Sequence, residues 1–394
     1  MRIGQITGEY PPMQGGVGAF TQELSHALCS LGHEVCIFTD HRGAGEERDA
    51  ENGVKVVADA HTWGWGTLSR IRRWAQAQKL DVINIQYQAA AYNMAAFIHI
   101  LPVRLDNVRV VTTFHDLLVP YLFPKAGPLR YQAVLTLARS SDGVIVTNRG
   151  DHDRLQAVKS LASLTHIPIG SNIKPNVPND YNRAVWRAAL GFQPSDIVVG
   201  YFGFLNSSKG VETLLQAVRI GRNKQLPIKL LMIGGRTGTS DPANIVYARE
   251  VDQMVEDLDL DPHIRWTGFV DDKAVSGHLK AADLIALPFR DGASFRRGSL
   301  LAALAHGCTV ITTHPELDTP DLISNQHVRL IASDSPTALA IAIEDLADNP
   351  DLCQTLAQNA EAVAQEFTWE SIARNTADYF EQLLQAAPDY LPTQ

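Results

Sequence analysis

Short apolar segments rich in Val and Ile alternate along the chain with longer segments whose apolar residues recur at helical spacing. This alternation is typical of parallel β-sheets whose strands are joined by crossover helices. In the first half of the chain it predicts strands at residues 2–7, 34–39, 81–87, 108–114 and 143–148. In the second half it predicts strands at residues 197–202, 228–233, 264–267, 284–287 and 310–313, and a further one at 328–332. We therefore expect an α/β protein with two doubly wound parallel sheets.

The first crossover helix follows a loop that is rich in Gly and Pro. Its apolar face is formed by Phe20, Leu24, Ala27, Leu28 and Leu31. The helix is expected to end at Gly32, because glycine is favoured directly after a helix C-terminus. Residues 351–384 are also predicted to be mainly helical, with an apolar face at Trp369, Ile372, Ala373, Ala377 and Phe380. We expect this tail to pack back across the domains.

The segment 167–182, IPIGSNIKPNVPNDYN, is rich in Pro, Gly and Asn and favours neither helix nor strand. The strand pattern restarts after it, so we place a linker there. A chain of 394 residues with 45% hydrophobic residues is long enough for two domains of roughly 150 residues each. We expect Rossmann-like domains at residues 1–172 and 193–366, a linker at 173–192 and a C-terminal helix at 367–394.

The composition excludes several classes of protein. A net charge of −9 disfavours nucleic acid as a partner, because proteins that bind polyanions carry a basic face. The four cysteines lie far apart and form no CxxC pair, which is typical of core thiols in a reducing compartment. No apolar run is long enough for a signal peptide or a membrane-spanning helix. We expect a cytoplasmic protein, with a peripheral location at the inner membrane face as the alternative.

Ligands of open α/β sheets bind at the loops that follow the carboxyl ends of the strands. The first such loop has Gly15, Gly16 and Gly18 before a helix, where free backbone N–H groups and the helix N-terminus favour an anion. The alternative interpretation is a plain flexible turn. Glu9 precedes these glycines and is a candidate contact for an acceptor or a sugar.

The second loop, residues 203–210, follows the first strand of the second domain and places Lys209 at the start of the next helix. The helix N-terminus and the lysine together suit a diphosphate, and Gly203 is a further candidate contact for the donor. The motif is not a P-loop, because Lys209 precedes a glycine instead of a Ser or Thr. Taken alone, Lys209 is equally well interpreted as a solvated lysine beside a turn.

The third loop lies between the strands at 284–287 and 310–313 and opens a helix of small residues. Arg296 and Arg297 are candidates for binding phosphate oxygens in a fork. Gly298 permits the close approach of a ligand, and Ser299 is suited to cap the helix or to donate to an oxyanion. Consecutive arginines are commonly surface charge, which is the alternative interpretation.

The fourth loop contains His115 and Asp116 at the end of a strand of the first domain. A polar pair at this position is a candidate for contact with substrate hydroxyls, and a structural histidine is the alternative. A metal site at Asp151, His152 and Asp153 is disfavoured, because this segment begins a helix and Asp is favoured at helix N-termini. We therefore expect no metal.

A basic and aromatic segment of the first domain raises the question of lipid contact. On a predicted helix and beside it lie Trp63, Trp65, Trp74, Arg70, Arg72, Arg73 and Lys79. Helices of this composition lie on anionic membranes. We favour the other interpretation, a solvated crossover helix with two indoles anchored in the core.

The four loops, in this order and with one pair in each domain, resemble those of the retaining GT-B glycosyltransferases of family 4, which include bacterial mannosyltransferases and sucrose synthases. The resemblance covers nearly the whole chain. It is carried by PPMQGGVGAFTQELSHALCSLGHEV, TTFHD, FGFLNSSKGVETLLQA, GFVDD, AADLIALPF and ALAHGCTVIT. It implies a hexosyltransferase-type enzyme whose two Rossmann-like domains close over a nucleotide-diphosphate sugar.

The resemblance also implies roles for single residues. Lys209 would neutralise the donor diphosphate, Gly16 would give it backbone access, and His115 would contact the donor sugar near the reacting carbon. Gly235 and Phe269 would line the base pocket. The implied reaction is a front-face substitution with retention and without metal, in which the leaving diphosphate helps to take the proton of the acceptor hydroxyl. The acceptor would be a glycan, a lipid-linked sugar or a small molecule.

Departures from the family pattern concern charged residues. Phe204 stands where the family commonly has an arginine of a GRLxxxKG pattern, so one phosphate contact is missing. Ser294 and Ala302 stand where the family has paired glutamates, the second of which usually holds the ribose hydroxyls. Arg296 and Arg297 offer charge in compensation. We expect an active but divergent subgroup; the alternative is a catalytically silent protein of the same fold that binds sugar nucleotides or acts as a scaffold.

Overall fold

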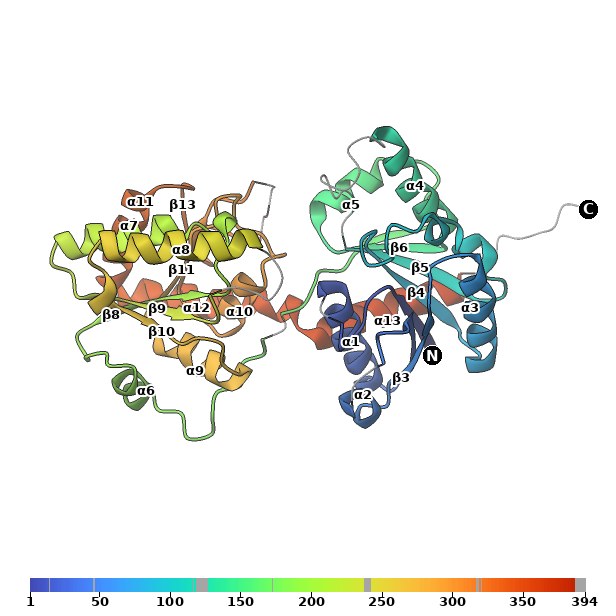
Figure 1. Ribbon diagram of the computed structural model, residues 1–394, viewed down its shortest axis with the longest axis horizontal. Helices are drawn as coiled ribbons and strands as arrows, with labels where there is room; N and C mark the ends of the chain where they lie inside the picture. The colour runs from blue at the N-terminus through green and yellow to red at the C-terminus, as the bar shows by residue number, and fades with distance from the viewer. Residues whose placement is uncertain are drawn as a thin grey trace, which may run out of the picture. The chain divides into compact units, whose positions relative to one another are not determined.

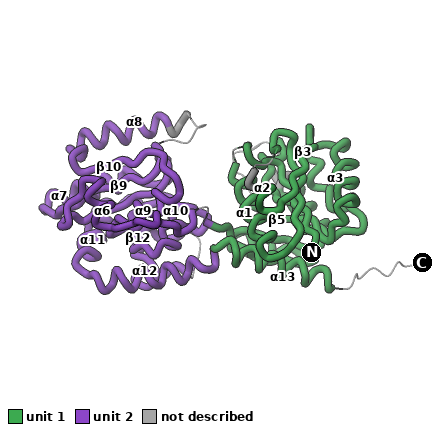
Figure 2. Tube along the Cα trace, turned by 90° about the horizontal axis from the view of Figure 1, so that it is seen from below, with its two compact units in different colours: residues 1–170, 368–394 green, residues 171–367 purple. Residues whose placement is uncertain are grey.

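The computed structural model describes the chain except for residues 14, 45–46, 116, 118–126, 172, 237–241, 317–318, 320 and 387–394. The chain divides into two compact units, which Figure 2 shows in different colours. The first unit consists of residues 1–170 and 368–394, and the second consists of residues 171–367. The C-terminal segment of the chain therefore belongs to the first unit.

Seven parallel strands form the sheet of the first unit in the order β3-β2-β1-β4-β5-β6-β7. The strands are β1 Arg2–Thr7, β2 Glu34–Asp40, β3 Lys55–Ala60, β4 Val82–Tyr87, β5 Arg109–Phe114, β6 Gly143–Val146 and β7 Leu164–His166. β1 pairs with both β2 and β4, so the strand order reverses at β1. The loops that follow β1 and β4 diverge there, which is where ligands of such sheets bind.

Helices cover both faces of this sheet (Figure 1). They are α1 Gly16–Ser30, α2 Glu47–Glu51, α3 Trp65–Gln78, α4 Gly127–Ser140, α5 Arg149–Gln156 and α13 Trp369–Gln385, with the 3₁₀ turns η1 Ala96–Ile100 and η2 Pro102–Arg104. On one face, Leu24 of α1 and Phe380 of α13 pack in one apolar cluster with Val82. On the other face, Ile71 of α3 and Leu137 of α4 belong to a second cluster.

Six parallel strands form the sheet of the second unit in the order β10-β9-β8-β11-β12-β13. The strands are β8 Ile197–Phe202, β9 Ile228–Ile233, β10 Ile264–Trp266, β11 Leu284–Leu287, β12 Val310–Thr313 and β13 Arg329–Ile331. The helices are α6 Arg183–Ala189, α7 Val211–Asn223, α8 Pro242–Asp257, α9 Asp272–Ala281, α10 Gly298–Ala305, α11 Pro336–Ala347 and α12 Pro350–Ala364. The 3₁₀ turns are η4 Ser207–Lys209, η5 Asp261–His263 and η6 Gln365–Phe367. One continuous apolar cluster fills this unit.

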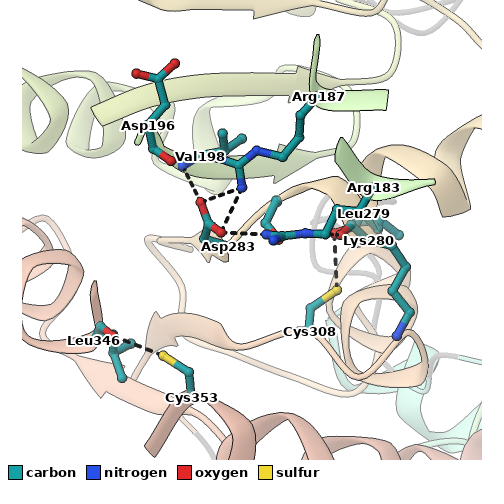
Figure 3. Close-up of polar contacts among 11 residues, drawn as sticks. Arg183, Arg187, Asp196, Val198, Leu279, Lys280, Asp283, Cys308, Leu346 and Cys353 are labelled. Atoms are coloured by element: carbon teal, nitrogen blue, oxygen red, sulfur yellow. Dashed lines mark hydrogen bonds and ion pairs between the residues drawn. The ribbon is translucent and has the colours of Figure 1, made fainter. Parts of the chain in front are cut away.

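An ion-pair cluster around the buried Arg187 fixes α6 to the second sheet (Figure 3). The Asp283 carboxylate accepts hydrogen bonds from Arg187 Nη1 at 2.9 and 3.0 Å, from Arg183 Nη2 at 2.5 Å and from the Val198 N–H at 2.7 Å. Because Arg187 is buried, removing its carboxylate partner would leave an unpaired charge in the core. Residues 183–189, which the sequence analysis placed in a linker, therefore form a helix that belongs to the second unit.

The expected architecture is confirmed, since both sheets are parallel and doubly wound and each predicted strand is present. Helix α1 ends as predicted, with Gly32 at a φ of 88° directly after its C-cap Leu31. Two further strands, β3 and β7, were not predicted. β3 is mostly half-buried and interrupted by a charged residue, and β7 has three residues. None of the helices in the described part of the chain has the length and apolarity needed to span a bilayer.

Candidate active site

The turn after β8 is shaped by two glycines. Gly203 has a φ of 121° and Gly210 a φ of 64°, backbone conformations that favour glycine. A Cβ atom at Gly210 would clash with the carbonyl oxygen of Pro288. This close approach packs the turn against the end of β11 and places Lys209 directly before Gly210, the N-cap of α7.

The ammonium group of Lys209 lies against the backbone of this turn. A Cβ atom at Gly203 would lie 2.6 Å from Lys209 Nζ and 3.9 Å from the Cβ atom of Ser299, the second residue of α10. Burial and, to a smaller extent, the positive charge of Arg297 lower the pKa of Lys209 to about 8. Among the described residues, no carboxylate pairs with this ammonium. Lys209 is therefore a partly desolvated cation for which the described residues provide no counter-ion.

Arg297 is the second cation at this place and immediately precedes α10. Its guanidinium lies 4.7 Å from the centroid of the Phe289 ring, and its Nη1 donates to Ser208 Oγ at 3.3 Å. Its Nη2 pairs with the carboxylate of Asp291. The ring, the hydroxyl and the carboxylate fix the guanidinium, so two positive charges converge where the β8 turn meets the start of α10.

The remaining predicted residues of this loop have different surroundings. Ser294 accepts hydrogen bonds from the Arg296 N–H at its Oγ (3.3 Å) and from the Arg297 N–H at its carbonyl oxygen (2.9 Å), which shapes the turn before α10. Arg296 and Gly298 are exposed, and a Cβ atom at Gly298 would meet nothing within 4 Å. Ala302 is 0% exposed. Position 302 therefore belongs to the core, and the small side chain there is packed instead of facing a ligand.

Gly235 and Phe269, the predicted base-pocket residues, follow two neighbouring strands. β9 pairs with β10, and just beyond these strands Gly234 and Gly268 form an isolated antiparallel bridge. This bridge brings the two loops together at the carboxyl ends of their strands. The Phe269 side chain is 85% exposed, so the faces of its ring are accessible to a planar ligand.

In the first unit, the glycine-rich loop already carries an anion of its own. Glu9 Oε1 accepts hydrogen bonds from the N–H groups of Val17 at 3.0 Å and Gly18 at 3.3 Å, at the start of α1. A Cβ atom at Gly15 would clash with this carboxylate, whereas a Cβ atom at Gly16 would meet nothing within 4 Å. The helix N-terminus that we expected to favour an external anion is therefore neutralised by Glu9.

A buried carboxylate stabilises the loop that carries Glu9. Asp49 Oδ1 accepts hydrogen bonds from Tyr10 OH at 3.0 Å and Gln22 Nε2 at 3.1 Å, and it lies 2.8 Å from His26 Nε2. All four side chains are buried. Since Tyr10 directly follows Glu9, the network fixes this loop over the start of α1. The sequence analysis did not predict it.

His115 is half-buried at the end of β5 and is held by buried amides. Its Nε2 lies 2.8 Å from Gln86 Oε1, and Gln86 Nε2 donates to Gln5 Oε1 at 2.9 Å. The His115 ring also contacts the Phe20 ring of α1 edge-on, with 4.6 Å between centroids. Gln5 and Gln86 were not predicted, although each is a buried polar residue within a strand that the sequence does predict. A buried glutamine in such a strand is the signal that would have found them.

Two further predicted sites remain. Asp116, a predicted contact for substrate hydroxyls, lies outside the described residues. Asp151 forms reciprocal hydrogen bonds with Asn148, from its N–H to Asn148 Oδ1 at 2.8 Å and from Asn148 Nδ2 to its carboxylate at 2.7 Å. It also pairs with Arg154 at 3.2 Å. The segment at Asp151 thus caps α5, as interpreted from the sequence.

The fold defines the class of protein. Sucrose-phosphate synthase from Thermosynechococcus elongatus is similar with a TM-score of 0.73 and 21% identity, over 98% of this chain and 100% of that chain. Anabaena HepE in complex with UDP is similar with a TM-score of 0.77 and 19% identity, over 97% of this chain and 100% of that chain. The two Rossmann-like units are therefore those of a GT-B fold, as predicted.

Residues 15–170 match the family model of the glycosyl transferase 4-like domain, and residues 196–349 match that of the glycosyl transferases group 1. These matches cover more than half of the chain, which therefore belongs to the group 1 glycosyltransferases. The D-inositol 3-phosphate glycosyltransferase of Corynebacterium kroppenstedtii is 23% identical over 404 residues, covering 95% of this chain and 86% of the relative. A glycogen synthase of Mycobacterium tuberculosis is 26% identical over 423 residues, covering 96% and 94%. The prediction of a hexosyltransferase-type enzyme is confirmed.

Proposed function

We propose that this glycosyltransferase moves a sugar from a nucleotide-diphosphate sugar to a hydroxyl acceptor, with retention at the anomeric carbon and without a metal ion. The observation that carries the proposal is the convergence of Lys209 and Arg297 beside Gly203 and Ser299. Lys209 is a partly buried cation there, with its pKa lowered chiefly by burial, and the described residues supply no carboxylate partner for it.

The cation pair suits the diphosphate of such a donor. The lowered pKa of Lys209 means that its protonated form is costly in the free protein, and a bound anion removes that cost. Arg297 adds a planar fork of N–H donors, and the N-terminus of α10 adds partial positive charge. Arg297 thereby supplies charge that the chain lacks at Phe204. Together these groups offset the negative charge of a diphosphate without a metal.

The proposed reaction places the growing charge on the leaving diphosphate. The bond between the anomeric carbon and the diphosphate oxygen breaks while the acceptor oxygen bonds to the same face of that carbon. The proton of the acceptor hydroxyl moves to the leaving diphosphate oxygen. Lys209 and Arg297 stabilise this oxygen as its charge develops, which lowers the barrier. The resemblance assigns contact with the donor sugar to His115, which Gln86 holds in place.

Relatives support this class of donor. Anabaena HepE is known in complex with UDP and with UDP-glucose. A mannosyltransferase of Mycolicibacterium smegmatis, 24% identical over 292 residues that cover 72% of each chain, is named GDP-mannose-dependent. These donors differ in base and sugar and share the diphosphate, which is the part that the cation pair would hold.

Radiolabelled UDP-, GDP- and ADP-sugars test the proposal in buffer that contains EDTA. We expect hydrolysis or transfer from one donor, loss of this turnover in Lys209→Ala, and a product with the anomeric configuration of the donor by NMR. An inverted product would contradict retention. Saturable binding of a donor without turnover for any acceptor would contradict the whole proposal and support a catalytically silent sugar-nucleotide-binding protein.

A further inference from the structure

The three tryptophans of the basic aromatic segment differ in their surroundings. Trp63 and Trp74 are 6% exposed and belong to the core of the first unit. Trp65, the first residue of α3, is 63% exposed. Two of the indoles are therefore structural anchors, as we favoured from the sequence, and the third is a large apolar side chain in solvent.

Trp65 is the centre of a small mixed surface. Its ring contacts the buried Phe97 ring, with 6.0 Å between centroids, and the Arg104 guanidinium lies 5.8 Å from the Trp65 centroid. Next to Arg104, Val103 is 61% exposed. On the same face of α3, Arg72 Nε donates to the Arg104 carbonyl oxygen at 2.5 Å. We call Trp65, Val103, Arg104 and Arg72 the Trp65 patch.

The charge of the Trp65 patch is opposite to that of the protein as a whole. Arg72 and Arg104 belong to it, and Arg73 is exposed beside it on α3. One carboxylate at this surface, Asp106, lies 3.3 Å from Arg72 and is itself 76% exposed. The surface around these exposed apolar side chains is therefore rich in arginine, although the chain as a whole has a net charge of −9.

We propose that the Trp65 patch docks the first unit on an anionic lipid surface. Indole rings favour the boundary between lipid headgroups and acyl chains, and Val103 adds apolar area to insert. Each arginine near an anionic membrane adds electrostatic attraction to the lipid headgroups. Lipid also fits better than a second copy of the chain, because a symmetric contact would bring the arginines of two patches together.

The Trp65 patch lies at the same end of the first sheet as two of the candidate site residues. Trp65 begins α3 after the loop that follows β3, so it lies at the carboxyl-end edge of the first sheet. Glu9 follows β1 and His115 follows β5 at the same edge. Docking through Trp65 would therefore hold this edge close to the lipid surface.

Vesicle co-sedimentation of the full chain tests the proposal with a matched pair of variants. Val103→Asp places a negative charge in the patch, and Val185→Asp places one at a valine of the second unit that is 67% exposed. On vesicles containing phosphatidylglycerol we expect binding by the wild type and Val185→Asp, and at least ~10-fold weaker binding by Val103→Asp. Binding should fall on pure phosphatidylcholine and at high salt.

Several results would overturn the proposal. They are no binding to anionic vesicles, equal binding to neutral and anionic vesicles, and equal loss of binding in the two variants. Dimers that Val103→Asp dissociates in sedimentation velocity would also overturn it, since the patch would then be an interface between copies. Trp65→Ser provides a second variant without an added charge, and its binding should also be weaker than that of Val185→Asp, with the thermal midpoint confirming that each variant is folded.

Discussion

Two loops of this protein are both rich in glycine and both precede a helix, but one holds a carboxylate and the other holds a cation. The loop at Gly15–Gly18 and the turn at Lys209 each follow the first strand of their unit and lead into a helix. In the first loop, the N–H groups of Val17 and Gly18 are hydrogen-bonded to the carboxylate of Glu9. In the second, Lys209 has no carboxylate partner within the part of the chain that the structure describes, and its pKa is lowered. A glycine-rich helix start is therefore an anion site only when the chain does not supply the anion itself.

The largest effect is expected from Lys209→Met, which removes the partly buried cation. We expect kcat/KM to fall by ~10²–10³-fold, the cost of losing one preorganised group that stabilises developing charge. The thermal midpoint should stay or rise, because the buried ammonium is destabilising in the free protein at neutral pH. Steady-state kinetics and thermal unfolding measure the two effects. Lys273→Met, at an exposed lysine of α9, is the control and should change neither.

Arg297→Gln should have the next largest effect, because it removes the second charge and leaves the Phe289 and Ser208 contacts weakened. We expect donor affinity to fall by ~10–10²-fold, in the range for a charge-assisted hydrogen bond lost with its partner left unpaired. Arg296→Gln, at the exposed neighbouring arginine, is the matched control. Donor affinity is measured by calorimetric titration. Equal losses of affinity in the two variants would show that Arg297 contributes no more to donor binding than the exposed Arg296.

The pH dependence follows from Lys209. Because its pKa is about 8 and the protonated form binds the diphosphate, kcat/KM should fall by about tenfold per pH unit above that pKa. Binding of the donor above pH 8 should take up a proton, which calorimetry in buffers of different ionisation enthalpy detects. In Arg297→Gln the fall should move to higher pH, since the like charge that lowers this pKa is gone. A profile that is flat to pH 10 would show that Lys209 does not titrate in the reaction.

The smallest effects are expected for substitutions at two adjacent glycines of the first loop, Gly15 and Gly16. A Cβ atom at Gly15 clashes with the Glu9 carboxylate, so Gly15→Ala should lower the free energy of unfolding by about 1–2 kcal/mol. Gly16→Ala meets nothing within 4 Å and should be neutral within about 0.5 kcal/mol. Denaturant unfolding compares them. If Gly16→Ala were the more destabilising of the two, Glu9 would not occupy the place described.

Most of the fold could be predicted because its strands are short, continuous apolar runs. β3 was not predicted because an edge strand that is half exposed loses that pattern. β7 was not predicted because Leu164 is the one apolar residue among its three. The helix α6 was assigned to a linker because its attachment depends on Asp283, an aspartate far along the chain. Such pairings are set by the tertiary fold and leave no local periodicity.

Part of the candidate site could also be predicted, because that part depends on local features of the sequence. Lys209 was found because its turn has glycines at required positions after a clear strand, and these are local features. The role of Glu9 at the start of α1 was missed, because it depends on the loop folding back over its own helix and on the buried Asp49 network. The amides that hold His115 were also missed, since their pairing joins three strands.

The comparison between the two loops is tested most directly by titrating the full chain with UDP, GDP and ADP in a calorimeter and following the one that binds. Lys209→Met should weaken its binding by at least ~30-fold, while Glu9→Gln and Gly16→Ala should change it by less than ~3-fold, as expected for groups outside the charge pair. The opposite result, with Lys209→Met binding like the wild type and Gly16→Ala or Glu9→Gln changing affinity by tenfold or more, would place the diphosphate on the first loop and contradict the account.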